Sequence, residues 1–340
     1  MTRDARLHDT ETPNDDPGSI GQWLLENIRT TLSDMPELSR WPEVRRLIDR
    51  PVRPGSRPTW NYPATACAAV GAPPKAVLPA AVAVFCSLYS IHLVDDMLDD
   101  DPGGLFHELG TGTVANLALA LQGAAGKALA APGVSPERQA WMQEGLGQMT
   151  MATALGQDLD AKDPEGEDGY WRVVRLKTPP LFSFALYCGA VLGGADRDLA
   201  EAVGGFGNEL GDIVQVNDDL HDAMERPAAA DWGREWTNLP ILYARSADHG
   251  DRNEFLDLMQ GNLDAPGALE RAQEILVSSG AVSYCAYRII GAYRSAKERL
   301  NALDLVNPAA IEELLDHHIR PLERLFAALG VEEPERLFAE

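Results

Sequence analysis

Apolar residues recur at three- and four-residue intervals along most of the chain, which is the spacing of one face of an α-helix. Residues 137–155 and 181–194 show this spacing most clearly. No segment combines alternating apolar and polar residues with flanking hairpin turns, so the sequence predicts no strand. The pattern therefore predicts an all-α protein.

Clusters of glycine, proline and aspartate interrupt the helical pattern and predict the loops. They fall at residues 51–58, 72–74, 101–104, 131–135, 160–169, 226–233 and 261–267. These breaks predict about ten or more helices, and no linker is long or simple enough in composition to separate two domains. We therefore predict a disordered polar leader over residues 1–18 and one all-α domain over residues 19–340.

One helical segment is apolar enough to require a membrane test. Residues 76–94 contain no Asp, Glu, Lys or Arg, and 19 residues approach the length of a membrane span. The segment is rich in alanine, includes Pro79 and His92, and runs directly into seven residues that contain five aspartates. A helix that is apolar on all sides is typical of a buried protein centre. We therefore predict a core helix and no stable membrane span.

The charge balance narrows the possible partners. The 340 residues include 29 Lys and Arg against 52 Asp and Glu, a formal net charge of −23. Such acidity disfavours nucleic acid and anionic membrane surfaces but suits metal cations. The four cysteines show no paired or metal-binding spacing, and the polar first residues do not resemble a secretion signal. We therefore expect a reduced, cytoplasmic location and no nucleic-acid partner.

Two DDxxD motifs supply the candidate metal ligands. They are Asp95, Asp96 and Asp99, and Asp218, Asp219 and Asp222. Residues four apart lie on the same face of a helix, so the outer aspartates of each motif project side by side. Carboxylates are the hard oxygen ligands that Mg²⁺ prefers, often together with substrate phosphates. Each motif therefore predicts a face able to bind Mg²⁺.

The alternative is that each motif is an ordinary solvated acidic face of an acidic chain. The surroundings favour a site, because both motifs directly follow largely apolar helices. In addition, Asp99 to Asp101 precede Pro102 and so lie at a predicted helix C-terminus. Negative charge there opposes the helix dipole at a cost of about 0.3–1 kcal/mol per group. Bound cations would remove that cost.

Further polar residues lie between the two motifs. Gln157 and Asp160 end one predicted helix, and Lys177 and Thr178 precede a Pro-Pro pair. Lys177 suits an anion that two metal-loaded aspartate motifs also hold. The alternative for Lys177 is a surface lysine whose charged end reaches solvent.

In this order, the motifs resemble those of the trans-isoprenyl diphosphate synthases, the polyprenyl synthetase family, over about residues 50–305. The matching residues are Asp95, Asp96 and Asp99; Gln157 and Asp160; Lys177 and Thr178; and Gln215, Asp218, Asp219 and Asp222. Arg57-Pro58, residues 237–244 and Ser279-Gly280 match shorter family patterns. One DDxxD alone is weak evidence for this family, whereas the ordered set of motifs at this spacing is strong evidence.

The resemblance implies a single-domain class I isoprenoid synthase, an all-α bundle around a deep apolar pocket with the two motifs facing each other across its mouth. It implies that three Mg²⁺ ions bridge the motifs to the diphosphate of an allylic isoprenyl substrate, and that the protein forms a homodimer. The expected catalytic residues are Lys177, Asp95 and Asp219. The expected substrate-binding residues are Arg57, Gln157, Lys177, Thr178 and Gln215.

The chemistry explains why these residue types belong together. Breaking an allylic C–O bond requires stabilisation of the charge on the departing diphosphate, which metals and Lys177 supply. The allylic cation then requires a dry pocket with aromatic faces. Candidates for that lining are Trp60, Tyr89, Phe182, Phe184 and Phe206, although ordinary core packing is the favoured interpretation for each.

The chain departs from the family where chain-elongating members hold the diphosphate of isopentenyl diphosphate. The early loop keeps Arg57 but lacks the preceding Lys-Arg pair, and residues 102–105 read Pro-Gly-Gly-Leu in place of Arg-Arg-Gly. Asn217, His221 and Glu225 lie at i, i+4 and i+8, which partly resembles a metal motif of class I terpene cyclases. The departures weaken the case for a second diphosphate site.

Three hypotheses follow from these observations. The first is a Mg-dependent trans-polyprenyl synthetase that transfers an allylic prenyl group to isopentenyl diphosphate. The second is a class I terpene cyclase, or a prenyltransferase with another acceptor, that needs only one diphosphate site. The third is an inactive regulatory subunit of a synthase, which the six retained aspartates disfavour.

Overall fold

The computed structural model describes residues 17–49, 57–162, 165–233, 236, 238–261, 263 and 265–328. Within these ranges every regular element is a helix, and no β-strand occurs. The all-α prediction is confirmed. Most of the predicted leader, residues 1–16, lies outside the described residues, and the first helix begins at Pro17.

The first half of the chain forms the elements that carry the first aspartate motif. They are α1 (Pro17–Ser33), α2 (Pro42–Ile48), η1 (Thr59–Asn61), α3 (Tyr62–Ala69), η2 (Pro74–Val77), α4 (Leu78–Leu98), α5 (Phe106–Leu109), α6 (Thr111–Leu129) and α7 (Pro136–Asp160). The second half carries the second motif. Its elements are α8 (Gly166–Lys177), α9 (Pro179–Leu192), α10 (Arg197–Gly204), α11 (Phe206–Met224), η3 (Ala230–Gly233), α12 (Leu239–Ser246), α13 (Arg252–Gln260), α14 (Ala268–Ser278), α15 (Ala281–Asn301) and α16 (Ala309–Ala328).

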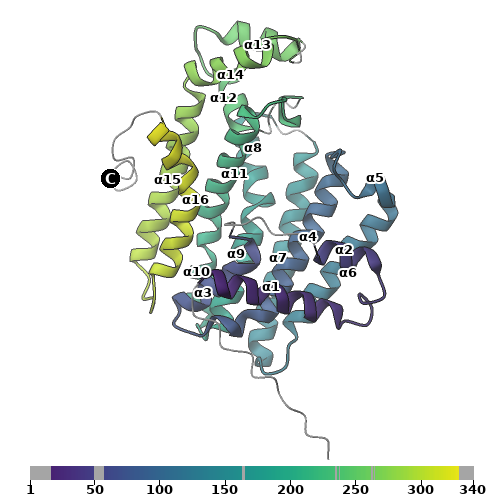
Figure 1. The fold of residues 1–340 in the computed structure, drawn as a ribbon. Coiled ribbons are helices and arrows are strands. Elements are labelled where there is room, and N and C mark those ends of the chain that lie inside the picture. The colour runs from purple at the N-terminus through teal and green to yellow at the C-terminus, as the bar shows by residue number, and fades with distance from the viewer. Residues whose placement is uncertain are drawn as a thin grey trace, which may run out of the picture.

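The long helices run side by side and form a bundle (Figure 1). Helix α4 packs against α6, α9 against α3 and α11, and α11 against α15. Helix α1 lies across one end of the bundle, while α13 and α14 stand at the other end (Figure 1). The first aspartate motif lies at the C-terminal end of α4, and the second lies in the C-terminal half of α11.

Helix α4 is the apolar segment that required the membrane test. Together with η2 it is long and apolar enough to cross a membrane, and 61% of its most apolar window is buried inside the protein. Its buried residues run from Ala80 to Ser87 and continue at Ser90 and Leu93. This burial supports the prediction of a core helix. The bent pair α14 and α15 also passes the length and composition test when it is taken as one span.

Two glycines, Gly211 and Gly156, allow close contacts between helices that carry residues of the predicted site. A Cβ on Gly211 of α11 would lie 2.4 Å from Cγ of Pro179 in α9. A Cβ on Gly156 of α7 would lie 2.6 Å from the carbonyl carbon of Leu176 and 2.7 Å from the backbone nitrogen of Lys177. No side chain fits at such distances, so these contacts fix α7 against the end of α8, and α11 against α9.

The helix boundaries refine the predicted loops. The loop predicted over residues 160–169 is shorter, because α7 continues to Asp160 and α8 already begins at Gly166. An additional break falls at Thr178, between α8 and α9. A proline disfavours the helical conformation of the residue before it, and it fits the first turn of a new helix. Pro179 therefore explains the break at Thr178.

The predicted aromatic residues are packed in the core. Trp60 and Tyr89 both contact Phe85, with ring centroids 5.3 Å and 4.5 Å apart. Phe182 packs against Tyr62 at 5.4 Å. Phe184 and Phe206 are buried as well. Sequence reasoning did not single out Phe85 or Tyr62, because single aromatic residues inside an apolar helix carry no distinguishing pattern.

Candidate functional site

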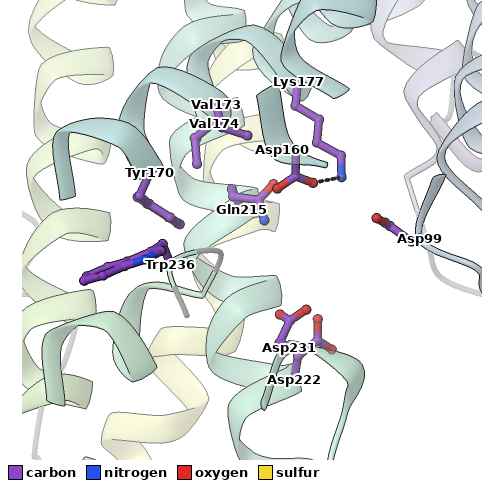
Figure 2. A pocket seen from close by; sticks show the side chains of 10 residues that line it. All are labelled: Asp99, Asp160, Tyr170, Val173, Val174, Lys177, Gln215, Asp222, Asp231 and Trp236. Carbon is purple, nitrogen blue, oxygen red and sulfur yellow. Dashed lines mark hydrogen bonds and ion pairs between the residues drawn. The ribbon is translucent and has the colours of Figure 1, made fainter. Parts of the chain in front are cut away.

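A polar pocket of about 170 Å³ lies between the ends of α4, α7, α8 and α11. Its lining residues are Asp99, Asp160, Tyr170, Val173, Val174, Lys177, Gln215, Asp222, Asp231 and Trp236. Figure 2 shows Asp99 on one side of the opening, Asp222 and Asp231 together on another, and Lys177 beside Asp160 above them. One residue of each aspartate motif therefore reaches the same pocket.

Lys177 connects the first motif to the end of α7. Its Nζ lies 2.9 Å from Oδ1 of Asp95 and 2.7 Å from Oδ2 of Asp160. The side chain is 21% exposed. Desolvation lowers the pKa of Lys177, but the charges and hydrogen bonds of Asp95 and Asp160 outweigh that effect and raise the pKa above its ordinary value. Lys177 therefore stays protonated at neutral pH and presents a positive charge to the pocket.

Gln157 fixes the first motif to α7. Its Nε2 donates to the carbonyl of Ile91 at 3.1 Å and lies 3.5 Å from Oδ1 of Asp95. The close approach at Gly156 brings the same part of α7 to the backbone of Lys177. The predicted substrate-binding glutamine thus supports the carboxylate that pairs with the predicted catalytic lysine.

The first motif lies at the C-terminus of α4, as predicted. Asp95 and Asp96 belong to the last turn, and Asp99 is the C-cap residue. Asp100 has a φ of 52°, a left-handed conformation that aspartate tolerates better than most residues. Asp99 is exposed, whereas Asp95 and Asp96 are half-buried. The motif is therefore open to solvent at Asp99, which lines the pocket.

The second motif lies inside α11, where Asp222 lines the pocket and Asp218 is exposed to solvent. Desolvation, together with the nearby charge of Asp222, raises the pKa of Asp218 to about 6. Burial also raises the pKa of Asp222, followed by the charge of Asp231. Asp218 is nevertheless exposed to solvent. Carboxylates that repel one another in this way favour a bound cation.

Asp219 differs from the other predicted metal ligands. It is 1% exposed and does not line the pocket. Oδ2 accepts hydrogen bonds from the hydroxyl of Tyr170 at 2.6 Å and the backbone N–H of Leu239 at 2.8 Å. Oδ1 accepts one from Nε2 of Gln215 at 2.9 Å. Both carboxylate oxygens are therefore engaged with protein donors.

Thr178, Gln215 and Arg57 complete the predicted set. The hydroxyl of Thr178 donates to Oε1 of Gln215 at 3.0 Å, so both residues belong to the network around Asp219. Arg57 instead forms an ion pair with Glu313 of α16, with NH2 and Oε2 3.3 Å apart. Arg57 is not among the residues that line the pocket. The structure thus joins Thr178 and Gln215 to the site and pairs Arg57 with the last helix.

Asp231 is a pocket residue that sequence reasoning missed. It lies in η3, and its Oδ2 accepts a hydrogen bond from Nδ2 of Asn238 at 3.0 Å. Desolvation is the main cause that raises the pKa values of Asp219 and Asp222, and the charge of Asp231 adds to it. The only sequence signal is an aspartate in the loop that follows the second motif, which is weak in so acidic a chain.

The donor set of this pocket fits Mg²⁺ bound together with a diphosphate. Within the described residues, no group of three or more His, Cys, Asp or Glu side chains is arranged to hold a metal ion by itself. Mg²⁺ is commonly bound through one or two carboxylates, with water and substrate phosphates as the other ligands. Asp99 on one side and Asp222 on the other supply such carboxylates, and Lys177 supplies a cation for the same anion.

Comparison with known proteins places the chain in a family. The polyprenyl synthetase family model matches residues 75–276, which is more than half of the chain. The geranylfarnesyl diphosphate synthase of Methanosarcina mazei is 33% identical over 116 residues, covering 33% of this chain and 39% of that protein. The enzyme of the same name from Aeropyrum pernix is 30% identical over 169 residues, covering 47% and 50%. The chain thus spans at most about half the length of these two relatives.

Solved structures share the fold over nearly the whole chain. A polyprenyl synthetase from Streptomyces coelicolor superposes with a TM-score of 0.76 at 20% identity and covers 89% of this chain and 99% of that one. A geranylgeranyl pyrophosphate synthetase from Pyrococcus horikoshii gives 0.76 at 21% identity, covering 89% and 97%. The protein belongs to the polyprenyl synthetase family and has the all-α fold of class I isoprenoid synthases.

Proposed function

We propose that this protein is a Mg-dependent isoprenoid synthase that ionises an allylic isoprenyl diphosphate and transfers the prenyl group. The observation that carries the proposal is the meeting of Asp99, Asp222 and Lys177 at one pocket, from three segments far apart in sequence. Family membership supports the same reaction class.

The proposed metal ligands are the aspartates of the two motifs that face the opening, and Asp231 beside Asp222 adds a further carboxylate. Bound Mg²⁺, three ions per site by analogy with the family, would neutralise the diphosphate and stabilise its departure. Lys177 holds a positive charge near the leaving group and stays protonated, because Asp95 and Asp160 raise its pKa. Gln157 and Asp160 fix Asp95 and Lys177, so the charge is in place before the substrate binds.

A terpene cyclase, or a prenyltransferase with a different acceptor, is the second candidate. Two observations favour it over chain elongation. There is no lysine or arginine between Asp95 and Lys127, and Arg57 of the early loop is paired with Glu313. Both leave fewer cations for the diphosphate of isopentenyl diphosphate, and each charge-assisted hydrogen bond contributes about 1.5–3 kcal/mol.

A product assay distinguishes these reactions. The purified protein is incubated with Mg²⁺ and geranyl, farnesyl or geranylgeranyl diphosphate, with and without isopentenyl diphosphate, and products are analysed before and after phosphatase treatment. A longer prenyl alcohol that requires both isopentenyl diphosphate and phosphatase indicates elongation. A hydrocarbon or alcohol formed without either indicates cyclase chemistry. No Mg-dependent diphosphate release with any substrate would contradict the proposal and favour the inactive-subunit hypothesis.

We also propose that the protein is a cytoplasmic homodimer. Large apolar side chains stand exposed on α6 and α7, where Leu119 is 71%, Met151 68% and Leu155 50% exposed. Such residues suit an interface between two copies. The four free, buried cysteines suit a reducing location. Light scattering of the wild type and of Leu119→Glu/Met151→Glu tests the dimer, and a wild-type monomer would exclude it.

A further inference from the structure

We propose that Arg288 of α15 is a positioning residue of the site, because it clamps α8, the helix that presents Tyr170 and Lys177 to the pocket. The inference rests on the proposed function and deepens it, because it gives a residue outside the pocket a role in the same reaction. The α8 clamp consists of Glu167 and Trp171 on α8 and of Tyr284 and Arg288 on α15.

One face of α8 lines the pocket. Tyr170, Val173, Val174 and Lys177 follow one another at three- and four-residue steps, and all belong to the lining. Trp171 is the residue after Tyr170 and is therefore rotated from it by about 100° around the helix axis. Its ring is buried and contacts the Tyr170 ring edge-on, with centroids 5.0 Å apart. A group that holds Trp171 therefore also fixes the direction of the pocket-lining face.

Arg288 holds Trp171 from the side of α15. Its guanidinium lies over the indole, with Cζ 3.8 Å from the ring centroid, which is a cation–π contact. Nη1 of Arg288 lies 2.9 Å from Oε1 of Glu167, and Nε1 of Trp171 donates to the same oxygen at 2.9 Å. One carboxylate oxygen thus ties the stacked pair together.

Tyr284 adds a second point of contact. Its hydroxyl donates to Oε1 of Glu167 and accepts a hydrogen bond from Nη1 of Arg288 at 3.0 Å. Glu167 and Trp171 are four residues apart on α8. Tyr284 and Arg288 have the same spacing on α15, so each pair shares a face of its helix. A single contact would let α8 turn about it, whereas two contacts one helical turn apart resist rotation.

The rotation of α8 matters because small displacements change reaction rates. The ion pairs of Lys177 hold the C-terminal end of α8, and the clamp holds the half that carries Tyr170. Side-chain atoms lie about 5–6 Å from a helix axis, so a turn of about 10° moves them by about 1 Å. Misplacement by about 1 Å can cost about 100-fold in rate. Arg288 is not among the residues that line the pocket, so its effect on the reaction passes through α8.

The test removes the guanidinium. Arg288→Met keeps an unbranched side chain but loses the charge, the stacking and the hydrogen bonds, whereas Arg288→Lys keeps the charge. We expect Arg288→Met to lower kcat by about tenfold, with KM for the allylic diphosphate within about threefold of the wild type. Arg288→Lys should lie between the two, and it serves as the test if Arg288→Met does not fold. An unchanged kcat would overturn the positioning role.

Arg299→Met is the matched control. Arg299 lies on the same helix, with Cζ 5.5 Å from the centroid of Phe206 and Nη1 2.8 Å from Oε1 of Glu209. It combines the same two kinds of contact but makes them with the start of α11. We expect Arg299→Met to lower the melting temperature as much as Arg288→Met does, with kcat within about twofold of the wild type. Equal losses of kcat in the two variants would show a general loss of stability and would contradict the proposal.

A double-mutant cycle tests whether Arg288 acts through α8. Glu167→Gln keeps an oxygen that accepts from Trp171 but loses the charge that pairs with Arg288. Because both residues belong to one clamp, we expect the double variant to have a kcat within about twofold of that of Arg288→Met alone. Losses that multiply would show that the two residues act independently, against the proposal.

Amide hydrogen exchange is the readout that does not depend on turnover. We expect residues 166–177 to exchange at least about tenfold faster in Arg288→Met than in the wild type, and at the wild-type rate in Arg299→Met. Unchanged exchange in Arg288→Met would overturn the clamp. If the wild type itself turns over no allylic diphosphate, the proposed function has failed, and the exchange rates alone decide whether Arg288 holds α8.

Discussion

The two aspartate motifs have the same five-residue pattern but different surroundings. The first lies at the end of α4, with Asp99 as an exposed C-cap residue. The second lies within α11, where the flanking residues continue the helix and Asp219 is enclosed by α8 and α12. The first motif reaches the pocket through Asp99 and pairs with Lys177 through Asp95, whereas the second reaches the pocket through Asp222 and buries Asp219 in the core.

This difference teaches that a motif specifies residue types, while its place on the helix decides their roles. At a helix end, the chain turns away and leaves carboxylates in solvent. In mid-helix, neighbouring helices cover part of the circumference, so adjacent residues, which are about 100° apart, can differ in burial, as exposed Asp218 and buried Asp219 do. The same residue pattern therefore places carboxylates at an exposed helix end in one motif, and combines exposed and buried carboxylates in the other.

The largest expected effect comes from the first motif. Asp95→Ala removes the carboxylate that pairs with Lys177 at 2.9 Å and that Gln157 supports. We expect Mg-dependent release of diphosphate to fall by at least about 10³-fold, because a ligand and the orientation of Lys177 are lost together. Measurement of pyrophosphate release in the presence of each allylic substrate tests this. Turnover near the wild-type rate would remove the first motif from the metal site.

Removal of the cation between the motifs should be the next largest effect. Lys177→Met retains the length of the side chain but leaves Asp95 and Asp160 facing each other without a positive charge. We expect kcat to fall by about 10²-fold with a smaller change in Mg²⁺ dependence. Lys162→Met provides a control, since Lys162 pairs with exposed Asp158 on the same helix end. Equal rates for both variants would assign Lys177 to the surface.

The support of the first motif by α7 can be broken at one backbone contact. Gly156→Ala places a Cβ against the backbone of Leu176 and Lys177, so we expect a loss of stability of about 1–3 kcal/mol and a lower kcat. Gly147→Ala on the same helix has open space around its Cβ and should be neutral or slightly stabilising. Thermal unfolding of both variants checks the difference. A stable, active Gly156→Ala protein would show that α7 can move away.

The smallest expected effect concerns the pH dependence of the second motif. Because the pKa of Asp218 is raised to about 6 in the folded protein, the folded state holds this proton more tightly than the unfolded state does. Without metal, the free energy of unfolding therefore decreases as the pH rises from about 4 to 7. The Asp218→Asn variant cannot lose this proton and avoids the decrease. We expect a gain below about 1 kcal/mol at pH 7 in the presence of a chelator, after solvent screening. The gain should disappear when Mg²⁺ and pyrophosphate are added.

Sequence reasoning predicted the parts of this protein that depend on local pattern. The helical class, the core position of α4 and the helix end at Asp99 follow from spacing, composition and a proline downstream. The approach of both motifs to one pocket followed from the ordered resemblance to a family. These features are encoded within a few turns of the chain or in motif order.

The features that sequence reasoning missed depend on contacts between distant segments. In the sequence, Asp219 and Asp218 are equivalent members of one motif. In the folded protein, Tyr170 and Leu239 donate hydrogen bonds to Asp219 alone. Arg57 meets Glu313 across 256 positions of sequence. Asp231 gains its place only when the loop after α11 folds back over the pocket mouth. No periodicity or local propensity records such long-range pairings.

The balance of charge at the pocket has a consequence for the order of encounter. Four carboxylates, Asp99, Asp160, Asp222 and Asp231, surround the one ammonium group of Lys177 among the lining residues. A free diphosphate ester approaching this mouth meets a field of its own sign, whereas a magnesium complex of the same ester is largely neutralised. We therefore expect the association rate to follow the concentration of the magnesium complex. The supply of the cation, as well as that of the ester, then controls how often the reaction begins.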